Sequence, residues 1–240
     1  MKRGFWLNIS IATALCILSI ASSYVWWFYI HLGRDISPSG EQWGQFGDFF
    51  GGILNPLLSF MTICILIRTS IRQEKQEIRN RFDNRFYNMI DQLRKSADNL
   101  NFKFGSNVNW DFDAFFRYIE DSFFDSDDVS GLDSPRFKEA VFPILRQFYL
   151  ILKVINAEYE KGRINDEELQ EYFLLLINST EYRTLRFVVF NSLYYESISA
   201  SQYIINCNGF ISELKSIGFE KYINRVNAKK IEIKRLGNAP

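Results

Sequence analysis

Residues Trp43 to Ser59 read WGQFGDFFGGILNPLLS and place four glycines, one acid and one Asn-Pro pair at the start of a long apolar run. A glycine inside a helix costs roughly 1 kcal/mol and a proline about 3 kcal/mol. Both residue types are therefore expected only where a helix packs closely or bends. Their role depends on where this segment lies, which the neighbouring sequence indicates.

Two stretches of the chain lack Asp, Glu, Lys and Arg: 30 residues from Gly4 to Gly33 and 19 residues from Phe49 to Ile67. Such runs predict transmembrane helices, because about 20 residues cross the hydrocarbon core. The first run could instead be a cleaved signal peptide, but its apolar character continues through YVWWFYI, beyond a normal signal-peptide core. We therefore expect an uncleaved anchor over about residues 5–32 and a second span over about 46–67.

Basic residues predict the orientation of these spans. Lys2 and Arg3 precede the first span, whereas the intervening loop holds one basic residue and three acids. Six basic residues follow the second span: Arg68, Arg72, Lys75, Arg79, Arg81 and Arg85. The positive-inside bias therefore predicts cytoplasmic termini and an external loop. On this orientation the aromatic residues Trp26, Trp27, Tyr29 and Trp43 lie at the outer interface.

The small residues of the opening stretch recur at helical spacing. One line of a helix would carry Gly44, Gly47, Gly51, Asn55 and Ser59. Such a seam lets a second helix approach closely; we expect the first span as its partner, with a second subunit as the alternative. Pro56 cannot donate to the carbonyl of Gly52 and crowds it, which predicts a kink.

Asp48 is the one acid beside the second apolar run. A carboxylate in this position is a candidate functional group. It could instead start the helix at the outer headgroup level, since acids favour helix N-termini. The single histidine, His31, is expected to be an interfacial residue rather than a ligand.

The remaining sequence predicts an all-α architecture. An apolar stripe at three, four and seven spacing continues the second span into a stalk helix over 68–100, and residues 101–240 form a helical cytoplasmic domain. Ser134 and Pro135 predict a helix start, and Asn165 is expected to cap the next helix. Further helices are expected from Glu181 and over roughly 208–227. The basic C-terminal tail is expected to be solvated.

The sequence contains no recognisable catalytic arrangement. The three cysteines have no metal-ligand spacing and one histidine supports no Ser-His-Asp or Cys-His arrangement. Residues 111–133 hold eight acids, but DSDDVSG departs from a calcium loop because Val129 and Arg136 fall on ligand positions. We therefore expect no cofactor and no metal. The balance of 28 basic and 28 acidic residues argues against a nucleic-acid partner.

Two segments resemble the phage abortive infection proteins of bacteria (AbiC-like). WGQFGDFFGGILNPLLSF is similar to the membrane-entry signature of that family. The segment FPILRQFYLILKVINAEYEKGRINDEELQEYFLLLINSTEYRTLRFVVFNSL is similar to its later block, although FLLLINST is less polar than in family members. The resemblance implies anti-phage defence by arrest of the infected cell at the inner membrane. It marks the second segment as a candidate sensing block, with Tyr172, Glu181, Phe190 and Asn191.

The resulting hypothesis is a non-enzymatic membrane effector. Its cytoplasmic domain would sense infection and its spans would perturb the bilayer, as a homo-oligomer. Alternatives are a sensor or scaffold that signals to another protein, and a metal-dependent hydrolase or nuclease using Asp111, Asp113 and Asp125. The expected partners are the lipid bilayer and either a co-encoded defence protein or a phage component.

Overall fold

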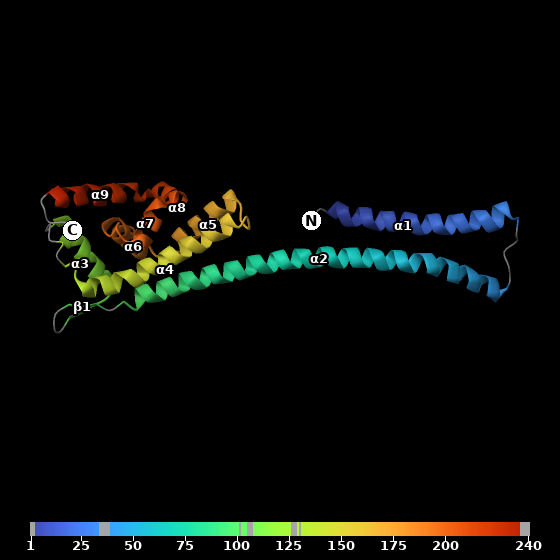
Figure 1. The fold of residues 1–240 in the computed structure, drawn as a ribbon, viewed down its shortest axis with the longest axis horizontal. Coiled ribbons are helices and arrows are strands. Elements are labelled where there is room, and N and C mark those ends of the chain that lie inside the picture. The colour runs from blue at the N-terminus through green and yellow to red at the C-terminus, as the bar shows by residue number, and fades with distance from the viewer. Residues whose placement is uncertain are drawn as a thin grey trace. The chain divides into compact units, whose positions relative to one another are not determined.

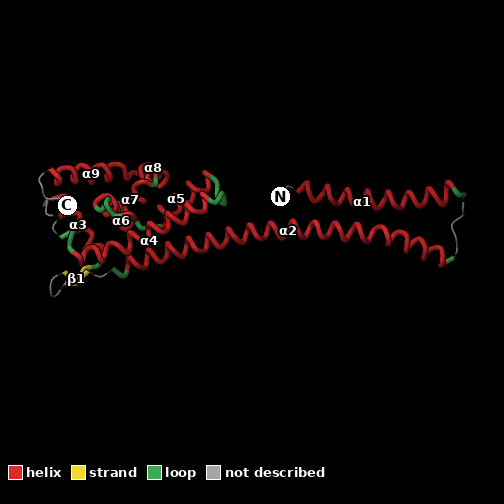
Figure 2. Tube along the Cα trace, in the orientation of Figure 1, coloured by secondary structure: helices red, strands yellow, loops and turns green. Residues whose placement is uncertain are grey.

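The computed structural model describes residues 3–33, 39–100, 102–104, 108–125, 129 and 131–235. These residues are almost entirely helical, which confirms the predicted all-α content (Figure 2). A short antiparallel strand pair was not predicted: β1 (Phe102–Phe104) lies against β2 (Val108–Trp110), with Phe102 opposite Trp110. Two compact units divide the chain, Met1–Arg79 and Asn80–Pro240, and the division falls within one long helix.

The N-terminal unit contains two long apolar helices. Helix α1 (Arg3–Val25) continues into the π-helical turn η1 (Trp26–His31), and α2 (Gly40–Asp98) begins after it. The Thr13 hydroxyl lies 3.8 Å from the Met61 sulfur, and the Tyr24 ring lies 4.5 Å from that of Phe46. The earlier residue of α1 (Thr13) thus contacts the later residue of α2 (Met61), and the later residue of α1 (Tyr24) contacts the earlier one (Phe46). The two segments therefore run in opposite directions (Figure 1).

Large apolar side chains of this unit face outward. Leu15, Leu18, Phe60 and Leu66 are each at least 60% exposed. Among the described residues, three helices are long and apolar enough to cross a membrane: Thr13–His31, Trp43–Asp98 and Pro135–Glu160. In the first two, none of the most apolar stretch is buried inside the protein, whereas 39% of it is buried in the third.

The third of these helices, α4 (Pro135–Glu160), is amphipathic. Its buried face follows helical spacing and comprises Phe137, Val141, Ile144, Leu145, Phe148, Ile151, Leu152, Ile155 and Glu158. This face packs within the C-terminal unit against α5 (Asp166–Ser179), α6 (Tyr182–Tyr194) and α7 (Ser199–Asn206). Its apolar residues therefore already have a protein partner.

Phenylalanine dominates the core of the C-terminal unit, which accounts for much of the unusual total of 23. Six of its described helices contribute a ring that is less than 2% exposed: Phe86 from α2, Phe123 from α3 (Phe112–Asp125), Phe148 from α4, Phe173 from α5, Phe187 and Phe190 from α6, and Phe210 from α8 (Asn208–Leu214). Aromatic rings bury large areas and prefer edge-to-face contacts. Phe123 and Phe190 meet in this way, with centroids 5.0 Å apart.

Two predicted helix starts are confirmed. The Phe137 N–H donates to the Ser134 hydroxyl at 3.3 Å, with Pro135 as the first helical residue of α4. At α5, the Glu168 N–H donates to the Asn165 side chain at 2.9 Å and the Glu168 carboxylate accepts from the Asn165 N–H. This reciprocal pair satisfies two N–H groups that a helix start leaves unbonded.

Several elements differ from the predictions. Helices α3 and α7 were not predicted. The turn η2 (Lys215–Phe219) and α9 (Glu220–Arg235) follow α8, so the tail expected to be solvated is helical as far as Arg235. Three residues of α9 are buried, Ile223, Val226 and Ile233, and they recur at helical spacing. The tail was misjudged because its basic residues hid this narrow apolar stripe.

Candidate functional site: the contacts of the long helix

All eight residues of the predicted membrane motif lie on α2, which is continuous through the proline: Trp43, Gly44, Gly47, Asp48, Gly51, Gly52, Asn55 and Pro56. The kink expected at Pro56 stays a prediction. Asp48 lies eight residues after the helix start at Gly40, and Glu41 is the acid of the first turn. Because the helix dipole acts within the first turn, Asp48 does not serve as the helix start, and that interpretation was wrong.

The glycine seam does not contact the first span among the described residues. A methyl group placed on Gly44 or Gly47 would have no described neighbour within 4 Å, and one on Gly51 would meet only Asn55 of the same helix, at 3.6 Å. Tyr24 of α1 instead packs against the rings of Phe46 and Phe49. The expected packing of the seam on the first span is therefore not observed, because aromatic side chains make that contact.

Two residues of the predicted sensing block contact the end of α2. The Tyr172 hydroxyl donates to the Asp83 carboxylate. Its ring packs edge-on against Phe82 and Phe86, with centroids 4.9 and 5.4 Å apart. Glu181, at the start of α6, lies 3.7 Å from the Arg94 guanidinium. The sequence marks these two residues but does not identify their partners on α2.

The other two residues of the block belong to the core. Phe190 and Asn191 are fully buried. The Asn191 amide donates to the Phe187 carbonyl at 2.8 Å, one turn earlier, while its own oxygen has no hydrogen-bond partner among the described residues. Neither side chain reaches the surface, so their role in this structure is packing.

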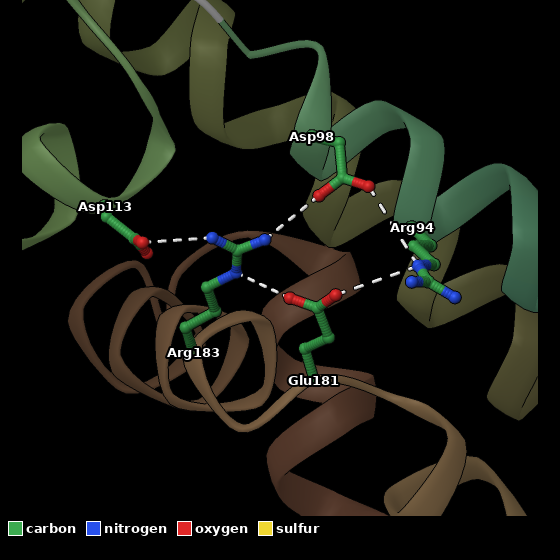
Figure 3. A network of polar contacts seen from close by, with 5 residues as sticks. All are labelled: Arg94, Asp98, Asp113, Glu181 and Arg183. Carbon is green, nitrogen blue, oxygen red and sulfur yellow. Dashed lines mark hydrogen bonds and ion pairs between the residues drawn. The ribbon is translucent and has the colours of Figure 1, made fainter.

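Arg183 joins three elements through a network of ion pairs (Figure 3). Its guanidinium donates to Glu181 at 2.6 Å, to Asp113 of α3 at 3.0 Å and to Asp98 of α2 at 3.1 Å. Arg94 extends the network, 4.0 Å from Asp98. These side chains are about half exposed, so each pair contributes little alone. Together they hold the last turn of α2 against α3 and α6.

A second arginine of α6 lies deeper. The Arg186 guanidinium contacts Glu120 at 2.5 Å and lies over the rings of Phe116, Tyr182 and Tyr222, 5.1 to 5.8 Å from their centroids. The Glu120 residue is only 8% exposed and also accepts a hydrogen bond from Tyr222. Burial raises the pKa of the Tyr222 phenol well above its usual range, so this group remains a donor.

Two of the three acids that could serve a hydrolase have other partners. Asp111 accepts from the Ala114 N–H at 2.8 Å at the start of α3, and Asp113 binds Arg183. Within the described ranges no three His, Cys, Asp or Glu residues are arranged to hold a metal ion. Asp127 and Asp128 lie outside the described residues.

No protein-family model, curated protein or solved structure matches this chain.

Proposed function

We propose that this protein is a membrane-anchored effector of bacterial anti-phage defence that stops growth of the infected cell. The resemblance of the two sequence segments to AbiC-like proteins supports the defence role. The observation that best supports the membrane role is the pair of long helices in the N-terminal unit, whose large apolar side chains are exposed. Exposed apolar surface of this extent is favourable in lipid rather than in water.

In this proposal α1 and the first part of α2 cross the inner membrane, and the C-terminal unit lies in the cytoplasm. Helix α4 stays in the core of that unit, because its apolar face already packs against other helices. The same helix α2 supplies both a span and part of the core, since it runs from Gly40 to Asp98. A change in the contacts that Asp83, Arg94 and Asp98 make within the C-terminal unit would thus act on the same helix that crosses the membrane.

The topology can be tested with reporter fusions after Gly40 and after Pro240. Two spans place these positions on opposite sides of the membrane, with Pro240 in the cytoplasm. If α4 also crossed, both positions would lie outside. A paired periplasmic and cytoplasmic reporter at each position serves as the control. Signals from the same side at both positions would contradict the two-span proposal.

The effector role is tested by inducing the full chain in bacteria and following growth together with membrane potential. We expect depolarisation to precede growth arrest, because a membrane effector acts before metabolism stops. The matched control is a chain carrying Leu57→Lys, near the centre of the second span, where a lysine costs about 3 kcal/mol of insertion free energy. Growth arrest with unchanged potential, or cleavage of nucleic acid by the purified full chain with magnesium, would reject the proposal.

A further inference from the structure

The C-terminal unit contains a cavity of about 600 Å³ between α3, α4, the α6–α7 turn and α9. This volume is in the range of small-molecule sites, which combine apolar walls with a few convergent polar groups. Three ammonium groups line it, from Lys138 of α4 and from Lys230 and Lys234 of α9. None of the sites described above uses these residues.

The cavity carries an excess of positive charge. Lys138 pairs with Asp133 at 3.1 Å, while Lys230 and Lys234 share the single carboxylate of Glu196 at 2.9 and 3.5 Å. Three ammonium groups thus face two carboxylates, which leaves one positive charge. The hydrogen bond from Lys230 lowers the pKa of Glu196, so its carboxylate is ionised at neutral pH.

The two side chains of the Lys230–Glu196 ion pair differ in how firmly they are held. The Lys230 side chain is 13% exposed, and its ammonium also donates to the Leu193 carbonyl at 2.6 Å. The Glu196 side chain is 54% exposed and lies on the turn between α6 and α7. Lys230 is therefore fixed in the cavity, whereas Glu196 can turn into solvent without losing a buried environment.

Aromatic rings form the apolar wall beside these charges. Tyr194 and Tyr195 meet edge-to-face at 4.8 Å, and Phe142 packs edge-on against Tyr195 at 5.7 Å. The Tyr195 hydroxyl donates to the Leu132 carbonyl, which fixes the orientation of its ring. The Tyr195 residue is only 6% exposed, so the open surface of this wall is provided by Tyr194 and Phe142. Such a surface favours a flat ring, as stacking on aromatic side chains is worth about 1–3 kcal/mol per nucleic-acid base.

We propose that this cavity binds a nucleoside monophosphate, with the base against the tyrosine wall and the phosphate on Lys230 and Lys234. In the absence of ligand the Glu196 carboxylate occupies the anion position, and the incoming phosphate displaces it. The inference goes beyond the effector proposal because it gives the C-terminal unit a ligand. It is tested by direct binding, so its failure leaves the membrane role unaffected.

The test is isothermal titration calorimetry on the full-length chain in detergent, with adenosine, guanosine, cytidine and uridine 5′-monophosphates as probes. Adenosine and inorganic phosphate are the matched part-ligands. We expect at least one monophosphate to bind saturably, and we expect each part-ligand to bind at least ten-fold more weakly. If no monophosphate binds saturably, or if phosphate alone binds as tightly, the proposal is overturned.

Substitutions at Glu196 and at the two lysines should change the affinity for the monophosphate in opposite directions. Glu196→Gln removes the competing carboxylate and should tighten binding about ten-fold, whereas Lys230→Gln should weaken it about ten-fold or more. Lys234→Gln should also weaken binding and, being half exposed, is a safeguard if Lys230→Gln misfolds. Lys215→Gln, fifteen residues before Lys230 and outside the cavity lining, is the charge-matched control and should change nothing. Weaker binding by Glu196→Gln would overturn the displacement model.

Discussion

Replacing Arg186 with methionine is expected to lower the melting temperature of the full-length protein by about 6–12 °C. The Glu120 residue is 8% exposed and contacts Arg186 at 2.5 Å. Removing one partner of a buried ion pair leaves the other charge without compensation and costs about 3 kcal/mol. In a domain of this size, 1 kcal/mol corresponds to roughly 2–4 °C. The measurement is loss of helical circular dichroism on heating in detergent.

The matched control is Arg183→Met, three residues earlier on the same helix. Its carboxylate partners are 36–45% exposed, so water can replace the lost contacts and the expected cost is about 1 kcal/mol or less. The double variant Arg186→Met with Glu120→Leu should recover part of the lost stability, because no buried charge remains. If Arg183→Met and Arg186→Met lower the melting temperature equally, burial of the Arg186–Glu120 ion pair does not determine the size of the loss.

Local sequence signals were enough to predict the all-α content, although they missed helices α3 and α7. Uncharged runs predicted the long apolar helices, and side chains that cap helix ends predicted the starts of α4 and α5 at Ser134 and Asn165. These signals act within a few residues, so one sequence contains them. The short helices α7 and α8 are separated only at Cys207, and no strong capping side chain marks that break.

The partners in the candidate site could not be predicted in the same way. Arg186 and Glu120 lie 66 positions apart, and Tyr222 lies 102 positions from Glu120. Ion pairs at such separations depend on how helices pack, which periodicity does not reveal. One signal was present: Arg186 interrupts the apolar segment LRFVVF, and a charge within a buried face needs a partner.

The glycine seam shows a different limit of sequence reasoning. Small residues at four-residue spacing indicate close helix packing but do not identify the partner. The first span was the expected partner, yet α1 contacts α2 through Tyr24, which packs against Phe46 and Phe49. The ring contacts leave room at Gly47 and Gly51 for another helix. The alternative partner, a second copy of this chain, becomes the stronger proposal.

Gly51→Leu is therefore expected to abolish growth arrest while leaving membrane insertion intact. A methyl group at this position meets no described residue except Asn55 of its own helix, so a leucine can be accommodated within one chain. Between copies, the larger side chain separates the helices. Overpacking of this kind costs about 1–3 kcal/mol, which weakens association about 5- to 150-fold. The measurements are growth on induction and chemical crosslinking of the full chain in membranes.

Cys64→Leu supplies the control. It introduces a leucine thirteen residues later in the same apolar run, about 220° around the helix from Gly51 and away from the seam, where the native side chain is exposed. We expect it to insert, crosslink and arrest growth like the parent, with equal amounts of protein in the membrane fraction. If Gly51→Leu also crosslinks and kills like the parent, the seam is not an interface between copies. If both leucines abolish arrest equally, the loss does not come from the glycine seam as one packed face.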